Sequence, residues 1–166
     1  KMPNLGDHWY VNSLCILAIG KYFRINLNNL LIALEKFQLP KGRGNFLEIE
    51  KGLKKFYLID ESYNSNPASL SAALRQFRKM ETSGNKIVIL GDMKELGENS
   101  KNFHLNMKKC VEDSNVDVVF TIGKFMKSLH QVLSSNIEKY HFEDISKLEK
   151  DIMKRVKSDD CILVKG

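Results

Sequence analysis

Strand-like and helix-like segments alternate through most of this chain, and this alternation constrains its fold more than any other feature. From residue 46 onward, short runs rich in β-branched and aromatic residues are separated by longer segments with helical periodicity. The expected strands are residues 46–50, 55–60, 86–90, 116–122, 140–142 and 161–164, and the expected helices are residues 68–80, 98–113, 124–133 and 145–156. Such alternation requires right-handed crossovers and a mostly parallel sheet. The predicted fold class is α/β, a Rossmann-like three-layer sandwich with a mostly parallel sheet.

Two further helices are expected before this region. Residues 9–22 carry apolar side chains on most sides, which is typical of a buried helix, and residues 27–37 form the second pattern. Residues 38–44 contain Pro40 and two glycines, as a hinge between domains does. The chain is therefore divided into domains at residues 1–39 and 40–166.

The most polar junction between an expected strand and an expected helix is residues 59–67, Ile-Asp-Glu-Ser-Tyr-Asn-Ser-Asn-Pro. Ligands in open α/β sheets bind where strands deliver their carboxyl ends to loops. Pro67 suits the first position of the helix that follows. A turn rich in Asx and Ser that only caps a helix is the alternative, and composition alone favours it.

Composition limits the function classes. Three cysteines, far apart in the sequence, argue against a disulfide framework and against a zinc site, and they suit a reducing cytoplasm. No segment is long and apolar enough for a membrane span. The net charge of +6 comes from basic residues scattered among acidic ones, without a nucleic-acid-binding motif, so no nucleic-acid partner is predicted. No Gly-x-x-x-x-Gly-Lys-Ser/Thr phosphate loop occurs in the sequence.

Four sequence blocks together resemble the Mur ligase family. They are residues 6–14 (GDHWYVNSL), 40–44 (PKGRG), 59–67 (IDESYNSNP) and 90–97 (LGDMKELG), in the order and at the spacing that the family has. The resemblance implies that residues 1–39 are the C-terminal end of the family's central ATP-binding domain. It implies that residues 40–166 are most of its C-terminal Rossmann-like domain, so that the chain is a fragment of a longer protein.

The resemblance also implies an activity. It is ATP-dependent amide formation through an acyl phosphate, which adds D-alanyl-D-alanine to UDP-N-acetylmuramoyl-tripeptide in peptidoglycan precursor synthesis, in a cytoplasmic monomer. ATP and Mg²⁺ would be bound mainly by the missing part of the central domain, so the fragment alone is expected to be inactive, with no catalytic residue assignable in it. Two alternatives stay open: a non-catalytic Rossmann-like module that binds a nucleotide or a protein partner, and a sister ligase such as folylpolyglutamate synthase.

The resemblance assigns roles to individual positions. His8 and Asn12 would lie near the adenine, Arg43 would reach the nucleotide phosphates, and Asp60 or Glu61 would hold the ribose hydroxyls. The remaining assignments are Tyr63, Asn64 and Asn66 on the adenine side, Asp92, Glu95 and His104 on the substrate side, and no metal ligand.

Residue-level alternatives accompany these assignments. An exposed hinge arginine is nearly as compatible with Arg43, and Asn66 is equally compatible with a helix N-cap. For His104, a packed helix histidine is the commoner outcome. Which carboxylate of the acidic pair holds the ribose is also open.

Overall fold

The computed structural model describes the backbone of residues 7–166 and the side chains of residues 9–166. It separates the chain into two compact units, Lys1–Pro40 and Lys41–Gly166. Their boundary lies one residue after the predicted domain boundary.

The first unit is a pair of helices, α1 (Asp7–Tyr22) and α2 (Leu27–Lys36). The α2 helix begins after Asn26, whose side chain accepts hydrogen bonds from the main-chain N–H groups of Asn28 and Asn29. This is the N-cap arrangement that Asn favours. Both predicted helices are therefore confirmed.

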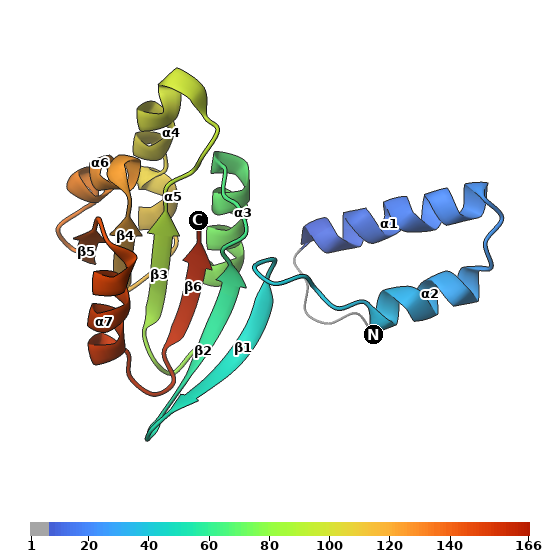
Figure 1. Ribbon diagram of the computed structural model, residues 1–166, viewed down its shortest axis with the longest axis horizontal. Helices are drawn as coiled ribbons and strands as arrows, with labels where there is room; N and C mark the ends of the chain where they lie inside the picture. The colour runs from blue at the N-terminus through green and yellow to red at the C-terminus, as the bar shows by residue number, and fades with distance from the viewer. Residues whose placement is uncertain (1–6) are drawn as a thin grey trace. The chain divides into compact units, whose positions relative to one another are not determined.

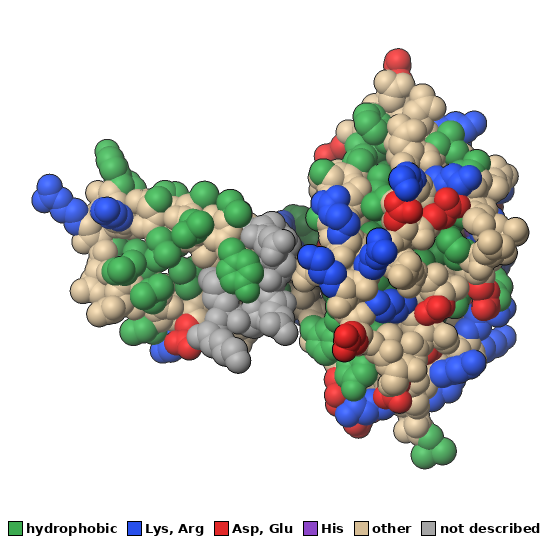
Figure 2. Space-filling model, turned by 180° about the vertical axis from the view of Figure 1, so that it is seen from behind, with side chains coloured by type: hydrophobic (Ala, Val, Ile, Leu, Met, Phe, Trp, Pro, Cys, Tyr) green, Lys and Arg blue, Asp and Glu red, His purple; other side chains and the backbone are tan. Residues whose placement is uncertain are grey.

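The prediction that the first helix is buried is wrong for this chain. Hydrophobic side chains gather over the surface of the α1–α2 pair (Figure 2), and no residue of α2 is buried. The large exposed apolar residues of this unit are Tyr10, Val11, Leu14, Ile16, Ile19, Tyr22, Phe23, Ile25, Leu27, Leu31, Ile32 and Phe37. Two helices cannot cover each other on every side, so apolar residues around α1 stay in contact with solvent.

The second unit is built on a six-stranded sheet (Figure 1). Its strands lie in the order β1-β2-β6-β3-β4-β5, and only β1 and β2 pair antiparallel. The strands are β1 (Asn45–Lys51), β2 (Lys54–Glu61), β3 (Lys86–Gly91), β4 (Val118–Ile122), β5 (Glu138–Phe142) and β6 (Cys161–Lys165). The predicted mostly parallel sheet is confirmed.

Helices cover both faces of this sheet. On one face, α3 (Pro67–Arg78), α5 (Lys108–Glu112) and α6 (Lys124–Val132) pack on Val88 and Leu90 of β3. On the other face, α7 (Ile145–Arg155) belongs to the cluster that contains Ile87 and Ile89 of the same strand. Successive side chains of a strand point to opposite faces, so one apolar strand supplies two cores. The architecture is the predicted three-layer sandwich.

The single helix expected over residues 98–113 is replaced by three short elements. These are the 3₁₀ turn η1 (Gly97–Asn99), α4 (Ser100–Asn106) and α5. At the break, the N–H of Met107 bonds to the carbonyl of His104, three residues back instead of four. This tighter turn redirects the chain, and His104 and Val111 on either side of it are both fully buried.

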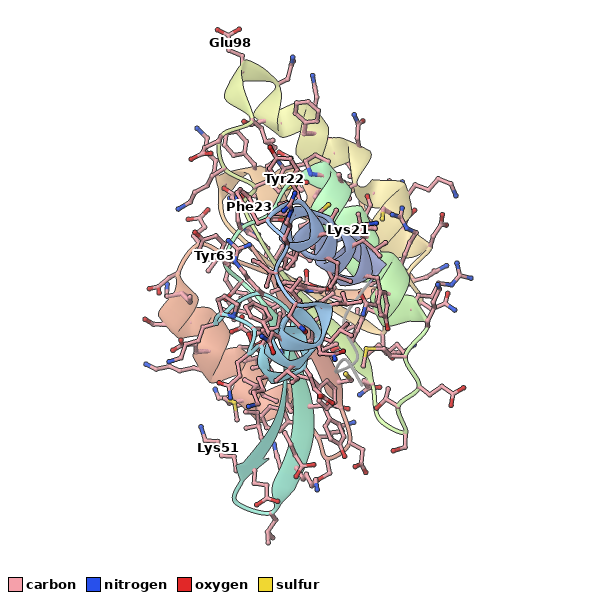
Figure 3. The ribbon with its side chains drawn as sticks, turned by 90° about the vertical axis from the view of Figure 1, so that its right-hand side faces the viewer. Lys21, Tyr22, Phe23, Lys51, Tyr63 and Glu98 are labelled. Carbon is pink, nitrogen blue, oxygen red and sulfur yellow. The ribbon has the colours of Figure 1, made fainter. Side chains whose placement is uncertain are left out.

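Parallel strands bring their carboxyl ends to one edge of the sheet. At this edge lie the ends of β2, β3, β4 and β6, and the start of the antiparallel β1, where Asn45 pairs with Asp60. Figure 3 labels Tyr63, which follows β2 at this edge, and Lys51, at the β1–β2 turn at the opposite end of the unit. The two predicted ligand loops, after β2 and after β3, therefore share one rim.

Candidate functional site

The residues just before β1 are fastened to the turn after β2. We call residues 41–44 the hinge segment and residues 60–66 the acidic turn. The N–H of Gly44 donates to the Asp60 carbonyl at 2.8 Å, and the N–H of Tyr63 donates to the Gly42 carbonyl at 3.1 Å. Gly42 has φ +78°, and a Cβ there would lie 2.8 Å from the Tyr63 nitrogen, so this contact requires glycine.

The Asp60 carboxylate holds the two segments together. Its Oδ2 accepts the N–H of Gly42 at 3.2 Å, and its Oδ1 accepts both the N–H of Ser62 at 3.1 Å and the Ser62 hydroxyl at 2.6 Å. Both oxygens of Asp60 are therefore engaged within the protein.

Glu61 has a different environment, since it pairs with a buried lysine. The Nζ of Lys165, at the end of β6, lies 3.4 Å from Oε2 of Glu61 and donates to the main-chain carbonyl of Asn64 at 2.6 Å. The lysine residue is only 6% exposed. Glu61 and Lys165 are direct neighbours in the register of β2 and β6, which places the pair on one face of the sheet.

Arg43 and Tyr63 form the exposed part of the site. The guanidinium carbon of Arg43 lies 4.1 Å from the centre of the Tyr63 ring, a cation–π contact, and Tyr63 is 66% exposed. The planar guanidinium retains its hydrogen-bond donors for an anion while its face rests on the ring.

Asn64 and Asn66 organise the start of α3. The Asn64 side chain accepts the N–H of Ser65 at 2.8 Å. Asn66 forms a capping box with Ser69: its Oδ1 accepts the N–H of Ser69 at 2.8 Å, and its own N–H donates to the Ser69 hydroxyl at 3.0 Å. The helix N-cap predicted as the alternative for Asn66 is confirmed.

Asp92 caps the start of α6. Its carboxylate accepts the N–H of Phe125 at 3.1 Å and that of Met126 at 2.8 Å. The N-cap position itself is Gly123, with φ +109°, and a Cβ there would lie 2.4 Å from the Asp92 carboxyl carbon. A carboxylate from the loop after β3 thus replaces the capping side chain that glycine lacks.

His104 is a core residue, as the packed-histidine alternative predicts. It is fully buried, and its ring stacks on Phe125 with centroids 5.4 Å apart. Its Nε2 accepts the N–H of Met93 at 2.9 Å, so Nδ1 carries the proton and donates to the Ser100 carbonyl at 2.6 Å. The ring therefore connects the loop after β3 to α4.

The remaining predicted residues are Glu95, Asn12 and His8. Glu95 is exposed, with φ +61°, in the loop after β3. Asn12 is exposed on α1, in the first unit, and the side chain of His8 lies outside the described side chains. Over the part of the chain that the structure describes, no three His, Cys, Asp or Glu side chains are grouped to hold a metal ion.

The sequence interpretation missed Lys165, Ser62 and the Asp92–α6 contact. For Lys165, the sequence did offer a signal, because a lysine directly follows the apolar strand of residues 161–164. The partner of this lysine, Glu61, could not be predicted from the sequence, because Glu61 lies on β2, which is distant in the chain and adjacent only in the folded sheet. None of the helices within the described residues has the length and apolar character needed to cross a bilayer.

Comparisons with known proteins agree with this fold. The family described as Mur ligase, glutamate ligase domain, matches residues 42–166. Among curated proteins, the UDP-N-acetylmuramoyl-tripeptide–D-alanyl-D-alanine ligases of Bacillus subtilis and Rickettsia prowazekii are 29% and 31% identical to the chain. These matches cover 99% and 95% of this chain but 36% and 33% of the relatives, so the chain spans about a third of their length.

Solved structures give the same result. A crystal structure of MurF from Acinetobacter baumannii superposes with a TM-score of 0.77 at 25% identity, covering 97% of this chain and 35% of that one. MurF ligase from Thermotoga maritima, in complex with ADP, has a TM-score of 0.71 at 25% identity over 90% of this chain and 32% of that one. The family match extends over most of the chain and over all six strands of the sheet. On this basis, the chain belongs to the Mur ligase family and contains its glutamate ligase domain.

Proposed function

We propose that the chain is part of an ATP-dependent ligase that joins D-alanyl-D-alanine to UDP-N-acetylmuramoyl-tripeptide. The observation that carries the proposal is that curated ligases with this named activity match nearly the whole chain. The structure of the Thermotoga maritima relative with ADP supports a nucleotide as one ligand. The Gly91–Gly97 block and the Asn66–Pro67 junction favour this branch over a folate-type ligase.

The first unit would be the end of the central domain, with the domains divided at residues 1–39 and 40–166. Its exposed apolar side chains support this assignment, because such residues in a folded protein are normally covered by other parts of the same domain.

The second unit would contribute nucleotide contacts from its rim. Arg43 is suited to phosphate oxygens, since its planar fork can donate two hydrogen bonds. A carboxylate of the acidic turn would accept the ribose hydroxyls, with Tyr63, Asn64 and Asn66 on the adenine side. His8 and Asn12 would add adenine contacts from the first unit.

Asp92, Glu95 and His104 are proposed to face the substrate side. The hydrogen bonds of Asp92 and His104 support an indirect role, in which they hold the loop after β3 in place. Glu95 is the most exposed of the three and is proposed to meet a substrate directly.

The proposed reaction has two steps. The terminal carboxylate of the tripeptide attacks the γ-phosphorus of ATP, which forms an acyl phosphate and releases ADP. The amine of D-alanyl-D-alanine then attacks the acyl carbon, and the amide forms as inorganic phosphate leaves and the amine loses a proton. No three His, Cys, Asp or Glu side chains are grouped as metal ligands among the described residues, and no step on this chain's residues is assigned to Mg²⁺.

Phosphate release by the protein from the complete reading frame tests the proposal. The tripeptide nucleotide and D-alanyl-D-alanine are added with ATP, separately and together. Release only when both are present is expected, whereas the 166-residue chain alone should release none. No release from the longer protein under any combination would favour the non-catalytic nucleotide- or partner-binding module. We further propose that the protein is cytoplasmic, which its free cysteines support, and that it is a monomer. Size-exclusion chromatography of the longer protein tests the monomer, and elution as a dimer would refute it.

A further inference from the structure

We propose that Glu61, and not Asp60, is the carboxylate that faces the ligand, and that Lys165 is the residue that positions it. This inference rests on the proposed function, because it names the group that receives a vicinal diol of the nucleotide sugar. It also divides the adjacent acids into one structural and one ligand-facing carboxylate.

The two acids differ in the acceptor atoms that the protein leaves available. Asp60 accepts three hydrogen bonds, distributed over both oxygens, from the hinge segment and from Ser62. Glu61 uses Oε2 for Lys165, while its other oxygen, Oε1, has no donor among the residues that the structure describes. Oε1 lies towards Gly44, where even an added Cβ would stay 3.8 Å away. Glu61 therefore has an oxygen that can accept a ligand hydroxyl.

Strand geometry explains how Lys165 comes to hold Glu61. Tyr57 and Ile59 of β2 pack with the core cluster under α3, as do Cys161 and Leu163 of β6. Since side chains alternate along a strand, Glu61 and Lys165 extend the same face, towards the start of α3. There the lysine also donates to the Asn64 carbonyl, so one ammonium group fixes both ends of residues 61–64.

Stability alone does not explain why a lysine occupies this buried position near the start of α3. The start of a helix carries a partial positive charge, which disfavours a second positive charge nearby. Burial of an ion pair is also weak support for stability, because desolvation offsets the attraction. The neighbouring Ser65 hydroxyl is buried without a hydrogen-bond partner in the described structure. A polar group at this turn therefore remains available to bond with a ligand.

The test is a double-mutant cycle of Lys165→Met and Glu61→Gln in the protein from the complete reading frame, measured as KM for ATP and kcat. If Lys165 acts through Glu61, Lys165→Met raises KM about tenfold, as loss of an outer-shell partner does in metal sites, with kcat changed less than about twofold. In the Glu61→Gln background, the same substitution changes KM less than about twofold. Asp60→Asn, which keeps the shape of the side chain, should instead lower the unfolding temperature while KM of the folded protein stays within about threefold.

Two variants sharpen the cycle. Lys86→Met is the matched control, since Lys86 also donates to a main-chain carbonyl but stands at the amino end of β3; it should leave KM unchanged. Lys165→Gln keeps a donor for Asn64 and removes the charge, so it serves if the methionine variant does not fold, and it should also raise KM. Additive effects in the cycle, or wild-type KM in Lys165→Gln, overturn the assignment of Lys165. An inactive wild-type protein that binds no ATP overturns the proposed function, and this inference with it.

Discussion

Replacing Asp92 by alanine should destabilise the second unit by about 1–3 kcal/mol. The carboxylate accepts two N–H groups in the first turn of α6, and Gly123 at the N-cap has no side chain to replace it. Loss of a capping side chain costs about 0.5–2 kcal/mol. Loss of the negative charge at the helix start adds about 0.3–1 kcal/mol. Asp92→Asn keeps an acceptor and removes only the charge, so its cost should be confined to the second contribution.

Urea unfolding followed by circular dichroism measures both variants, with the slope m expected to stay constant. Glu98→Ala is the control: this exposed residue has no hydrogen-bond or ion-pair partner among the described residues, and its replacement should change the free energy of unfolding by less than about 0.5 kcal/mol. Hydrogen exchange at the amides of Phe125 and Met126 should accelerate in Asp92→Ala. Stability equal to that of the control, with exchange at α6 unchanged, would refute the capping role and leave Asp92 as a substrate contact.

Two further predictions concern the glycine contact at residue 42 and the half-buried histidines His130 and His141. Gly42→Ala should lower stability by roughly 1–2 kcal/mol more than Gly52→Ala, because both have positive φ but only the first would place a Cβ against Tyr63, at 2.8 Å from its nitrogen; equal losses in urea unfolding would contradict this contact. Burial lowers the pKa of His130 and of His141 below the usual 6.5, so the unfolded chain binds protons at these residues before the folded chain does as pH falls. The free energy of unfolding should therefore keep the full contribution of the neutral histidines above pH 6.5 and lose it progressively below that pH. The double variant His130→Gln/His141→Gln should show a flatter stability profile between pH 7.5 and 5.5, and an unchanged slope would show that other groups cause it.

The sequence predicted the strands because each reads as a short apolar run with turns at both ends. All six strands and the mostly parallel sheet followed from that pattern. The helix over residues 98–113 was predicted as continuous because nothing in its periodicity marks the turn at Met107. That turn allows His104 and Val111 both to be buried, and this requirement comes from tertiary packing and not from the local sequence.

The sequence indicated where the candidate site lies better than it indicated what each of its side chains does. Position after a strand indicated the acidic turn, but hydrogen bonds between distant segments decide what each side chain does. Asp60 bonds to Gly42, eighteen residues earlier, and Glu61 pairs with Lys165 on β6. No local pattern encodes either contact, so the division of work between the two acids required the structure.

The antiparallel direction of β1 has a topological consequence. Because β1 runs opposite to β2, it begins at the ligand rim, and the chain from the first unit joins the second one beside Asp60. A parallel β1 would instead begin at the far edge, about 23 Å away for seven residues at about 3.3 Å each. The hinge segment is bonded directly to the acidic turn, since the Gly42 N–H donates to the Asp60 carboxylate and the Gly42 carbonyl accepts the N–H of Tyr63. The segment through which the chain enters the second unit is therefore also the segment that holds the acidic turn in place.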